Sequence, residues 1–476
     1  MSITIPEVGK SREEIMSEMM KAREKDAKWE EGRIFSLVFH YSDEHTEFLK
    51  EVYTSFFHEN GLNPFAFQSL KKFESDVVKM VANLMNGDDN VVGCMTSGGT
   101  ESILLAMKTY RDYARWKRGD RYLVPEIIIP DTAHVAFEKA GEYFDIKMIH
   151  APVNRDGRVD IKAVEDRITS RTIALVGSAP NYPCGAVDPI FELGELAQKY
   201  DLLLHVDACI GGMVLPWWER LKQNVPPFDF RVPGVTSISV DIHKYGYSAK
   251  GASVILYRSI EIMKHQIFVY VNWPGGIFMS PGMLGTRPGG AIASAWASLM
   301  SLGQDGYIRN TELLIDTVER FQNGVKSITG LDIVGKPCGP VFAYYSTDKD
   351  LNIYAVADLM EEKGWHIDRQ QKPPSIHQMI NPTHRNIVDK YIDDLRESVE
   401  KVRRNPDIQK YSKAPTYGML ANVPARGLVE REVRKIVERI FTGEFDMEKF
   451  GEQERGNKIL NVIRDLIANL GISKKR

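Results

Sequence analysis

Apolar residues follow two alternating patterns between residues 65 and 260. Short apolar runs, typical of strands, occupy 91–96, 126–130, 147–152, 172–180, 202–209, 237–240 and 252–258. Longer stretches with helical spacing separate most of them, at 69–86, 100–117, 133–144, 159–168 and 189–200. Short apolar strands that alternate with helices predict an α/β fold, with a mainly parallel sheet covered on both faces. Ligands of such sheets gather at the carboxyl ends of the strands.

The chain on either side of this region has other patterns. Residues 11–29 have helical spacing behind a Ser11 cap, and Glu14 stands at the capping-box position. A second helix is expected over 45–59. Residues 274–290 are rich in Gly and Pro and are expected to be irregular. The part beyond 305 mixes helices with strands at 332–335, 340–347 and 365–370, and an amphipathic helix is expected near 459–470.

These patterns predict three parts of the chain. Residues 1–60 form a helical segment that clasps a dimer, residues 61–304 form a large α/β domain, and residues 305–476 form a smaller α+β domain.

Composition narrows the class of protein. The 476 residues are 43% hydrophobic and 26% charged, which is ordinary for a soluble globular protein. A formal net charge of -3 gives no reason to expect nucleic acid or an anionic membrane as partner. The four cysteines are too far apart in sequence to pair as metal ligands, so we expect reduced thiols and no metal site. We see no signal peptide and no transmembrane run, so the expected location is the cytoplasm.

A glycine-rich turn joins one predicted strand to the next helix. Its sequence, TSGGTES, covers residues 96–102. Gly98 and Gly99 let the backbone approach a ligand closely, and the helix start offers free N–H groups to a phosphate. The turn lacks the lysine of a P-loop and the spacing of a dinucleotide fingerprint. A tight strand-to-helix turn with no ligand would also explain both glycines.

Two ionisable residues follow predicted strands. Asp207 ends the run LLLHVDAC, where a buried charge needs a compensating partner such as a protonated pyridine nitrogen. A helix cap or a structural ion pair would also explain it. Lys244 follows the strand at 237–240, and a poorly hydrated lysine has a lowered pKa and can act as a nucleophile. A lysine that extends to solvent is the alternative.

The three features together indicate a cofactor. Pyridoxal 5'-phosphate needs an amine for its Schiff base, an acid on its ring nitrogen and a grip on its phosphate. The turn at 96–102, Asp207 and Lys244 supply the phosphate grip, the acid and the amine, in that order along an alternating αβ chain.

The motifs SGGTESI, HVDAC, HKYGY, GTRPGG and PPSIH together resemble those of the sphingosine-1-phosphate lyases. These are fold-type-I pyridoxal-phosphate enzymes related to the group II decarboxylases, and the resemblance covers about residues 30–420. It implies a homodimer with shared active sites and a retro-aldol cleavage. A phosphorylated sphingoid base, or a similar β-hydroxy amine, would give an aldehyde and phosphoethanolamine.

The resemblance also assigns roles to single residues. Lys244 resembles the Schiff-base lysine, Asp207 the pyridinium partner and His134 the imidazole that stacks on the cofactor ring. The expected phosphate contacts are Gly98, Gly99, Thr100 and His243, with Gly285 and Thr286 reaching the cofactor of the partner subunit. Tyr182 and Tyr417 match active-site tyrosines, and Lys250 matches a lysine that holds the substrate phosphate.

Two positions depart from the family. Phe39 stands where a tyrosine is usual and Asn63 where a histidine is usual, both associated with the substrate phosphate. Losing both polar groups should weaken binding of a dianion. The rival interpretation is therefore an amino-acid decarboxylase, and a third is a catalytically silent family member. A lyase needs a base for the β-hydroxyl proton, for which Tyr182 and a cofactor phosphate oxygen are candidates, whereas a decarboxylase needs none.

Overall fold

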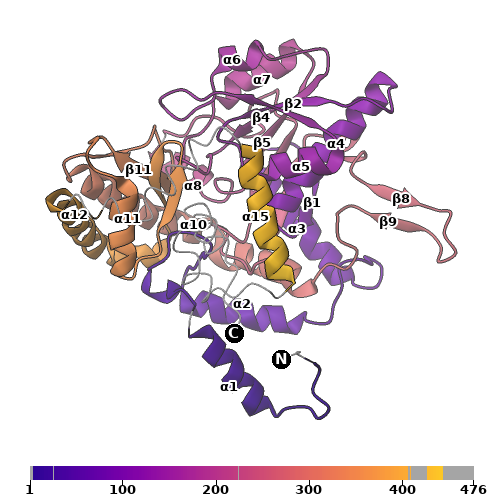
Figure 1. Ribbon diagram of the computed structural model, residues 1–476. Coiled ribbons are helices and arrows are strands. Elements are labelled where there is room, and N and C mark those ends of the chain that lie inside the picture. Colours follow the sequence, from indigo (N-terminus) through magenta and orange to yellow (C-terminus); the bar gives the residue numbers. More distant parts are fainter. Residues whose placement is uncertain (1–3, 25, 223, 406–407, 409–425, 443–476) are drawn as a thin grey trace.

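The computed structural model describes residues 4–442 apart from 25, 223, 406, 407 and 409–425 (Figure 1). A seven-stranded sheet lies at its centre, in the order β1-β7-β6-β5-β4-β2-β3. The strands are β1 (Val92–Thr96), β2 (Glu126–Pro130), β3 (Lys147–Ala151), β4 (Thr172–Ser178), β5 (Leu203–Asp207), β6 (Ser237–Asp241) and β7 (Ser253–Tyr257). All seven predicted strands are present, which confirms the α/β class.

One strand of this sheet runs against the others. β7 pairs antiparallel with both β6 and β1, whereas β2 to β6 pair in parallel. The connection from β6 to β7 is too short for a parallel crossover, which needs a dozen or more residues. The chain therefore turns back at the end of β6, and the loop that carries Lys244 is held by a strand at each end.

Helices cover both faces of the sheet. They are α3 (Gln68–Leu84), α4 (Gly99–Arg118), α5 (Ala136–Phe144), α6 (Ile161–Glu165), α7 (Ile190–Lys199), α8 (Leu215–Lys222), α9 (Ile260–Met263) and the long α10 (Gly289–Lys326). Successive residues of a strand point to opposite faces. Accordingly, Ile127 and Ile129 of β2 pack in one buried cluster, and Ile128 packs in the other. Burial on both faces explains why β2 and β4 are mostly apolar.

A second sheet, in the order β10-β11-β13-β12, lies beside the first. Its strands are β10 (Leu331–Ile333), β11 (Val341–Ser346), β12 (Asp368–Gln371) and β13 (Pro374–Met379), with helices α11 (Ile353–Glu362) and α12 (Val388–Arg404). The pattern of the sequence did not predict β13 as a strand. The predicted domain boundary at 304/305 lies inside α10, next to Gly303, where the helix is interrupted by a positive φ of 58°.

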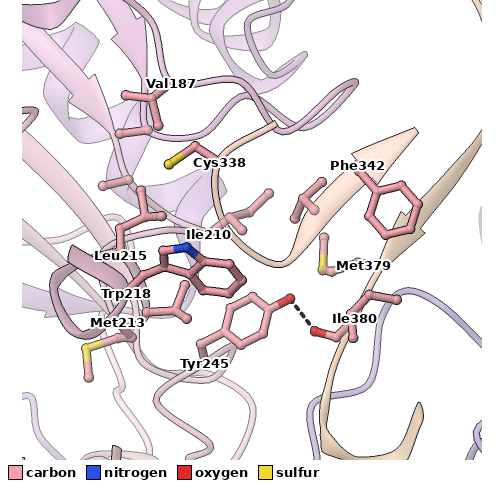
Figure 2. Close-up of a cluster of buried hydrophobic side chains, with 14 of the residues drawn as sticks. Val187, Ile210, Met213, Leu215, Trp218, Tyr245, Cys338, Phe342, Met379 and Ile380 are labelled. Atoms are coloured by element: carbon pink, nitrogen blue, oxygen red, sulfur yellow. Dashed lines mark hydrogen bonds between the residues drawn. The ribbon is translucent and has the colours of Figure 1, made fainter. Parts of the chain in front are cut away.

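The two sheets share one hydrophobic core. A single buried cluster contains Val206 and Val240 of the large sheet together with Val341 and Phe342 of the small sheet. Figure 2 shows part of this contact, where the Tyr245 hydroxyl donates a 2.8 Å hydrogen bond to the carbonyl oxygen of Ile380. Because Tyr245 follows Lys244, the small sheet helps to fix the loop that carries this lysine.

Two elements stand away from this body (Figure 1). Helix α1 (Arg12–Arg23) has the expected capping box between Ser11 and Glu14 but buries none of its side chains. Strands β8 (Phe268–Tyr270) and β9 (Phe278–Ser280) form a projecting hairpin, so the segment 274–290 is less irregular than predicted.

The remaining elements complete the description. Helix α2 (Asp43–Ser55) forms where it was predicted, and two short 3-10 helices cover Trp29–Glu31 and Pro382–Asn386. Helix α15 (Arg426–Phe441) is the last described element, and the helix predicted near 459–470 lies outside the described residues. Within the described residues, no helix combines the length and apolarity needed to cross a bilayer.

Candidate active site

The carboxyl ends of four strands meet along one edge of the large sheet. Ser178, at the end of β4, is opposite Asp207 of β5, and Asp207 is opposite Ser239 of β6. Asp241 ends β6 opposite Ser253, which is also the partner of Thr96 at the end of β1. The loops that follow these strands therefore emerge together.

A cavity of about 530 Å³ lies at this edge. Most of the predicted site residues line it, namely Phe39, Gly98, Gly99, Thr100, His134, Tyr182, Asp207, His243, Lys244 and Lys250. They come from six separate segments of the chain. The fold therefore brings the glycine turn, Asp207 and Lys244 together around one cavity, as a pyridoxal-phosphate site requires.

The glycine turn closes one side of the cavity. A Cβ atom at Gly99 would lie 2.6 Å from Cys209 Sγ and 3.0 Å from both carboxylate oxygens of Asp241. Only glycine fits there without displacing its neighbours. Glu101 stabilises the turn by accepting hydrogen bonds from the Ser97 amide and hydroxyl, at 2.7 and 2.6 Å. Its other oxygen accepts from the Met283 amide at 2.9 Å, which ties the turn to the segment after β9.

Lys244 is paired with a buried carboxylate. Its Nζ lies 2.9 Å from Oδ2 of Asp241, which is 2% exposed. Burial is the largest effect and lowers the pKa of Lys244, but the Asp241 carboxylate, together with Cys209 and Asp207, holds this pKa above its usual value. The expected lowering of the Lys244 pKa is therefore wrong. The reason is an acid three residues earlier, whose distance from the amine the sequence does not reveal.

Asp207 and His134 lie at other points of the cavity. Asp207 is 8% exposed, and its Oδ1 accepts a hydrogen bond from the Cys209 amide at 3.1 Å. His134 follows β2 and is exposed, with Nδ1 accepting from the Ala136 amide at 3.2 Å. The proton of a neutral His134 ring is therefore on Nε2.

Lys250, Phe39 and His243 form another part of the wall. The Lys250 Nζ lies 5.0 Å from the centroid of the Phe39 ring and donates to the His243 carbonyl oxygen at 3.3 Å. Burial, assisted by the nearby charge of Lys244, lowers the pKa of Lys250 to about 8. Burial also lowers the pKa of His243, although Asp241 opposes this shift. Phe39 thus contributes a ring face to the ammonium and no hydroxyl donor.

Tyr182 lines the cavity on the side of the small sheet. Burial, and to a smaller extent Asp368, raises the pKa of its hydroxyl well above the usual value. At neutral pH the phenol keeps its proton and donates hydrogen bonds. The raised pKa disfavours a phenolate, and the suggested role of Tyr182 as the base for a β-hydroxyl proton stays a prediction.

Three predicted residues lie away from the cavity, close to one another. Asn63 is exposed and caps its own turn, its Oδ1 accepting from the Phe65 and Ala66 amides at 3.0 and 3.3 Å. Gly285 and Thr286 are also exposed, and the Thr286 hydroxyl accepts from Asn60 at 3.2 Å. The structure therefore does not bring these three residues to the cavity within one chain. Tyr417 lies outside the described residues.

The cavity fits pyridoxal phosphate. It combines an amine, a carboxylate at the end of the neighbouring strand and a turn whose Gly99 leaves no room for a side chain. Sequence reasoning assigned no role to Glu101 or Asp241, although Asp241 was visible as a charged residue at the end of a predicted strand.

Sequence comparisons show which known proteins resemble this chain. Residues 5–344 match the family model described as the pyridoxal-dependent decarboxylase conserved domain. Sphingosine-1-phosphate lyase of Arabidopsis thaliana is 44% identical over 87% of this chain and 77% of its own length. Sphingosine-1-phosphate lyase 1 of Rattus norvegicus is 39% identical over 92% of this chain and 76% of its own length.

Solved structures lead to the same assignment. The sphingosine-1-phosphate lyase of Burkholderia pseudomallei superposes with a TM-score of 0.81 at 39% identity, covering 86% of this chain and 94% of that one. Glutamate decarboxylase of Lactobacillus brevis, at 20% identity and a TM-score of 0.73, shares the fold over 84% of this chain and 95% of its own. The cofactor is pyridoxal 5'-phosphate, and the chain belongs to the sphingosine-1-phosphate lyase family of pyridoxal-dependent enzymes.

Proposed function

We propose that this protein is a carbon–carbon lyase that cleaves a phosphorylated sphingoid base, or a similar β-hydroxy amine, to an aldehyde and phosphoethanolamine. The observation that carries the proposal is one cavity lined by Lys244, Asp207 and the Gly98–Gly99 turn, in a chain 44% identical to a sphingosine-1-phosphate lyase. Bound there, pyridoxal phosphate would withdraw the electron pair of a bond at the substrate Cα.

Each residue of the cavity has a role in this proposal. Lys244 supplies the amine that holds the cofactor, and Asp207 keeps a proton on the ring nitrogen. Gly98, Gly99, Thr100 and His243 bind the cofactor phosphate, and His134 covers the ring. Tyr182 donates a hydrogen bond to the oxygen on the substrate Cβ, and a phosphate oxygen of the bound cofactor would supply the base for the hydroxyl proton. Lys250, with a pKa of about 8, is positively charged at neutral pH and attracts the substrate phosphate.

A homodimer is the second element of the proposal. Its support is that Asn63, Gly285 and Thr286 are exposed in one chain and lie away from its cavity. Exposed apolar side chains on α1 (Ile15, Met16, Met19 and Met20) and on the β8–β9 hairpin (Phe268, Val269, Tyr270, Trp273, Ile277 and Met279) offer surface for a second copy. We also propose a cytoplasmic location, because all four cysteines are free and buried.

Binding of pyridoxal phosphate to Lys244 is the first part of the proposal to test. The purified protein should be yellow, and borohydride should fix the cofactor to Lys244, located by peptide mass. Lys244→Arg keeps the charge and should carry no fixed label. A wild-type protein that takes up no cofactor would refute the scheme.

A product assay separates the lyase from the decarboxylase. Sphingosine 1-phosphate should release a long-chain aldehyde, measured after trapping with a hydrazine. Carbon dioxide from an amino acid, with no aldehyde, would favour the rival. Because Phe39 and Asn63 offer neither hydroxyl nor imidazole, Phe39→Tyr with Asn63→His should lower the KM for the phosphorylated substrate.

A further inference from the structure

His377 lies directly behind Tyr182. It is on β13 of the small sheet and is fully buried, at 0% exposure. The two rings are stacked, with centroids 4.1 Å apart and planes 21° apart. The His377 Nε2 also lies 3.0 Å from the Tyr182 carbonyl oxygen. A carbonyl oxygen only accepts, so Nε2 carries the proton, and His377 holds both the ring and the backbone of one residue.

An acid lies beside His377 on the neighbouring strand. Asp368 of β12 is its directly opposed partner across the antiparallel pair, which places their Cβ atoms about 5 Å apart. Among the described residues, neither His377 Nδ1 nor Asp368 Oδ2 has a hydrogen-bond partner, although both atoms are buried. Leaving two polar atoms unsatisfied is costly, and an apolar pair would pack here at lower cost. Such an arrangement at the cavity wall points to a function beyond packing.

Asn181, next to Tyr182, also holds this loop. Asn181 donates to the Gly157 carbonyl oxygen at 2.9 Å and accepts from the Cys184 amide at 3.1 Å. On the small-sheet side, Met379 follows His377 on the same face of β13, lines the cavity and packs in the shared core (Figure 2). His377 thus lies on a strand that packs in the shared core, and its ring stacks on Tyr182, whose phenol lines the cavity and is protonated at neutral pH.

We propose that His377 is a positioning residue that holds the Tyr182 phenol against the reacting oxygen of the substrate. The proposal rests on the lyase function above. Burial lowers the pKa of His377 to about 4, against the opposing effects of Asp368 and the Tyr182 carbonyl. The imidazole is therefore neutral during turnover and acts through geometry, since it does not itself touch the substrate.

A double-mutant cycle tests the proposal. His377→Gln keeps an N–H donor without the ring, and His377→Phe keeps the ring without the donor. Each should lower kcat by about 10- to 100-fold, the loss typical of a group misplaced by about 1 Å. The KM and the cofactor affinity, followed by cofactor absorbance, should change less than about threefold, because cofactor contacts are untouched. In a Tyr182→Phe background the same substitutions should cost less than about threefold, because the positioned hydroxyl is gone.

Gln378→Leu provides a matched control. Gln378 is on the same strand, equally buried, but faces away from the cavity and donates to the Tyr391 hydroxyl at 2.9 Å. It should lower the melting temperature as much as the His377 variants do while kcat stays near the wild-type value. An equal loss of kcat in Gln378→Leu, or an undiminished effect of His377→Gln in the Tyr182→Phe background, would overturn the proposal.

A crystal structure of His377→Gln separates this proposal from the proposed function. A displaced Tyr182 ring supports positioning even if sphingosine 1-phosphate proves not to be a substrate. An unmoved ring overturns positioning even if the wild-type protein releases aldehyde.

Discussion

Asp241→Asn gives the sharpest test of how the site controls its lysine. The two side-chain atoms are 2.9 Å apart, so their attraction is about 6 kcal/mol at an effective dielectric constant of about 20. At about 1.4 kcal/mol per pKa unit, removing this attraction lowers the pKa of Lys244 by at most about 4 units. The substitution is nearly isosteric and leaves the desolvation of Lys244 and the charge of Lys250 in place. The pKa of Lys244 should fall from above its usual value to below it.

The assay is the rate of pyridoxal phosphate uptake by the cofactor-free protein, followed by absorbance between pH 6 and pH 10. Only the neutral amine attacks an aldehyde, so a pKa lowered by about 2 to 4 units raises the reactive fraction at pH 7 about 100-fold or more. Asp241→Asn should therefore take up cofactor faster at pH 7. Asp131→Asn, which removes an exposed carboxylate after β2, serves as the control and should match the wild-type profile. An uptake profile for Asp241→Asn that coincides with the wild type, or moves to higher pH, would refute the assigned role of Asp241.

Three further predictions use groups described above. Burial lowers the pKa of three histidines to about 4 (His205, His377 and His384). Their folded-state pKa values lie below the unfolded value of about 6.5, so the free energy of unfolding should fall as pH drops from about 6.5 to 4, by roughly 3 kcal/mol each. Burial raises the pKa of Asp188 to about 6, so protonation of this group should offset the contribution of one of the three histidines. Melting temperatures at pH 7 and pH 5 check the net fall in stability. The KM for sphingosine 1-phosphate should rise as pH exceeds about 8, where Lys250 loses its charge, whereas the KM for an unphosphorylated β-hydroxy amine should not. Gly99→Ala should abolish cofactor uptake and destabilise the fold by about 1–3 kcal/mol, because its Cβ would overlap Cys209, while Gly9→Ala, with open space around it, should leave both unchanged.

Periodicity was sufficient to predict the large sheet because strands such as β2 and β4 are buried along their whole length and are mostly apolar. It was insufficient for β13, whose buried side chains include Ser375, His377 and Gln378. A strand that buries polar groups has no apolar period for the sequence to reveal. Its sequence was recognised only as part of a family motif.

The site was predictable to the extent that motifs mark strand ends. The glycine turn, Asp207 and Lys244 line one cavity because parallel strands end at one edge. The sign of the Lys244 pKa shift was not predictable, since it depends on a distance of 2.9 Å to Asp241. The expected contact of Gly285 and Thr286 with a cofactor could not be checked in one chain, because that cofactor would be bound by a second copy.

The hydrogen bond from Tyr245 to Ile380 and the apolar cluster around it have a thermodynamic consequence. Since the core is continuous across both sheets, separating them would expose apolar surface on each and break a contact one residue from Lys244. The two sheets should consequently melt in one cooperative transition. A fragment that ends after α10 would retain the cofactor lysine in sequence but lose the packing that keeps it in place.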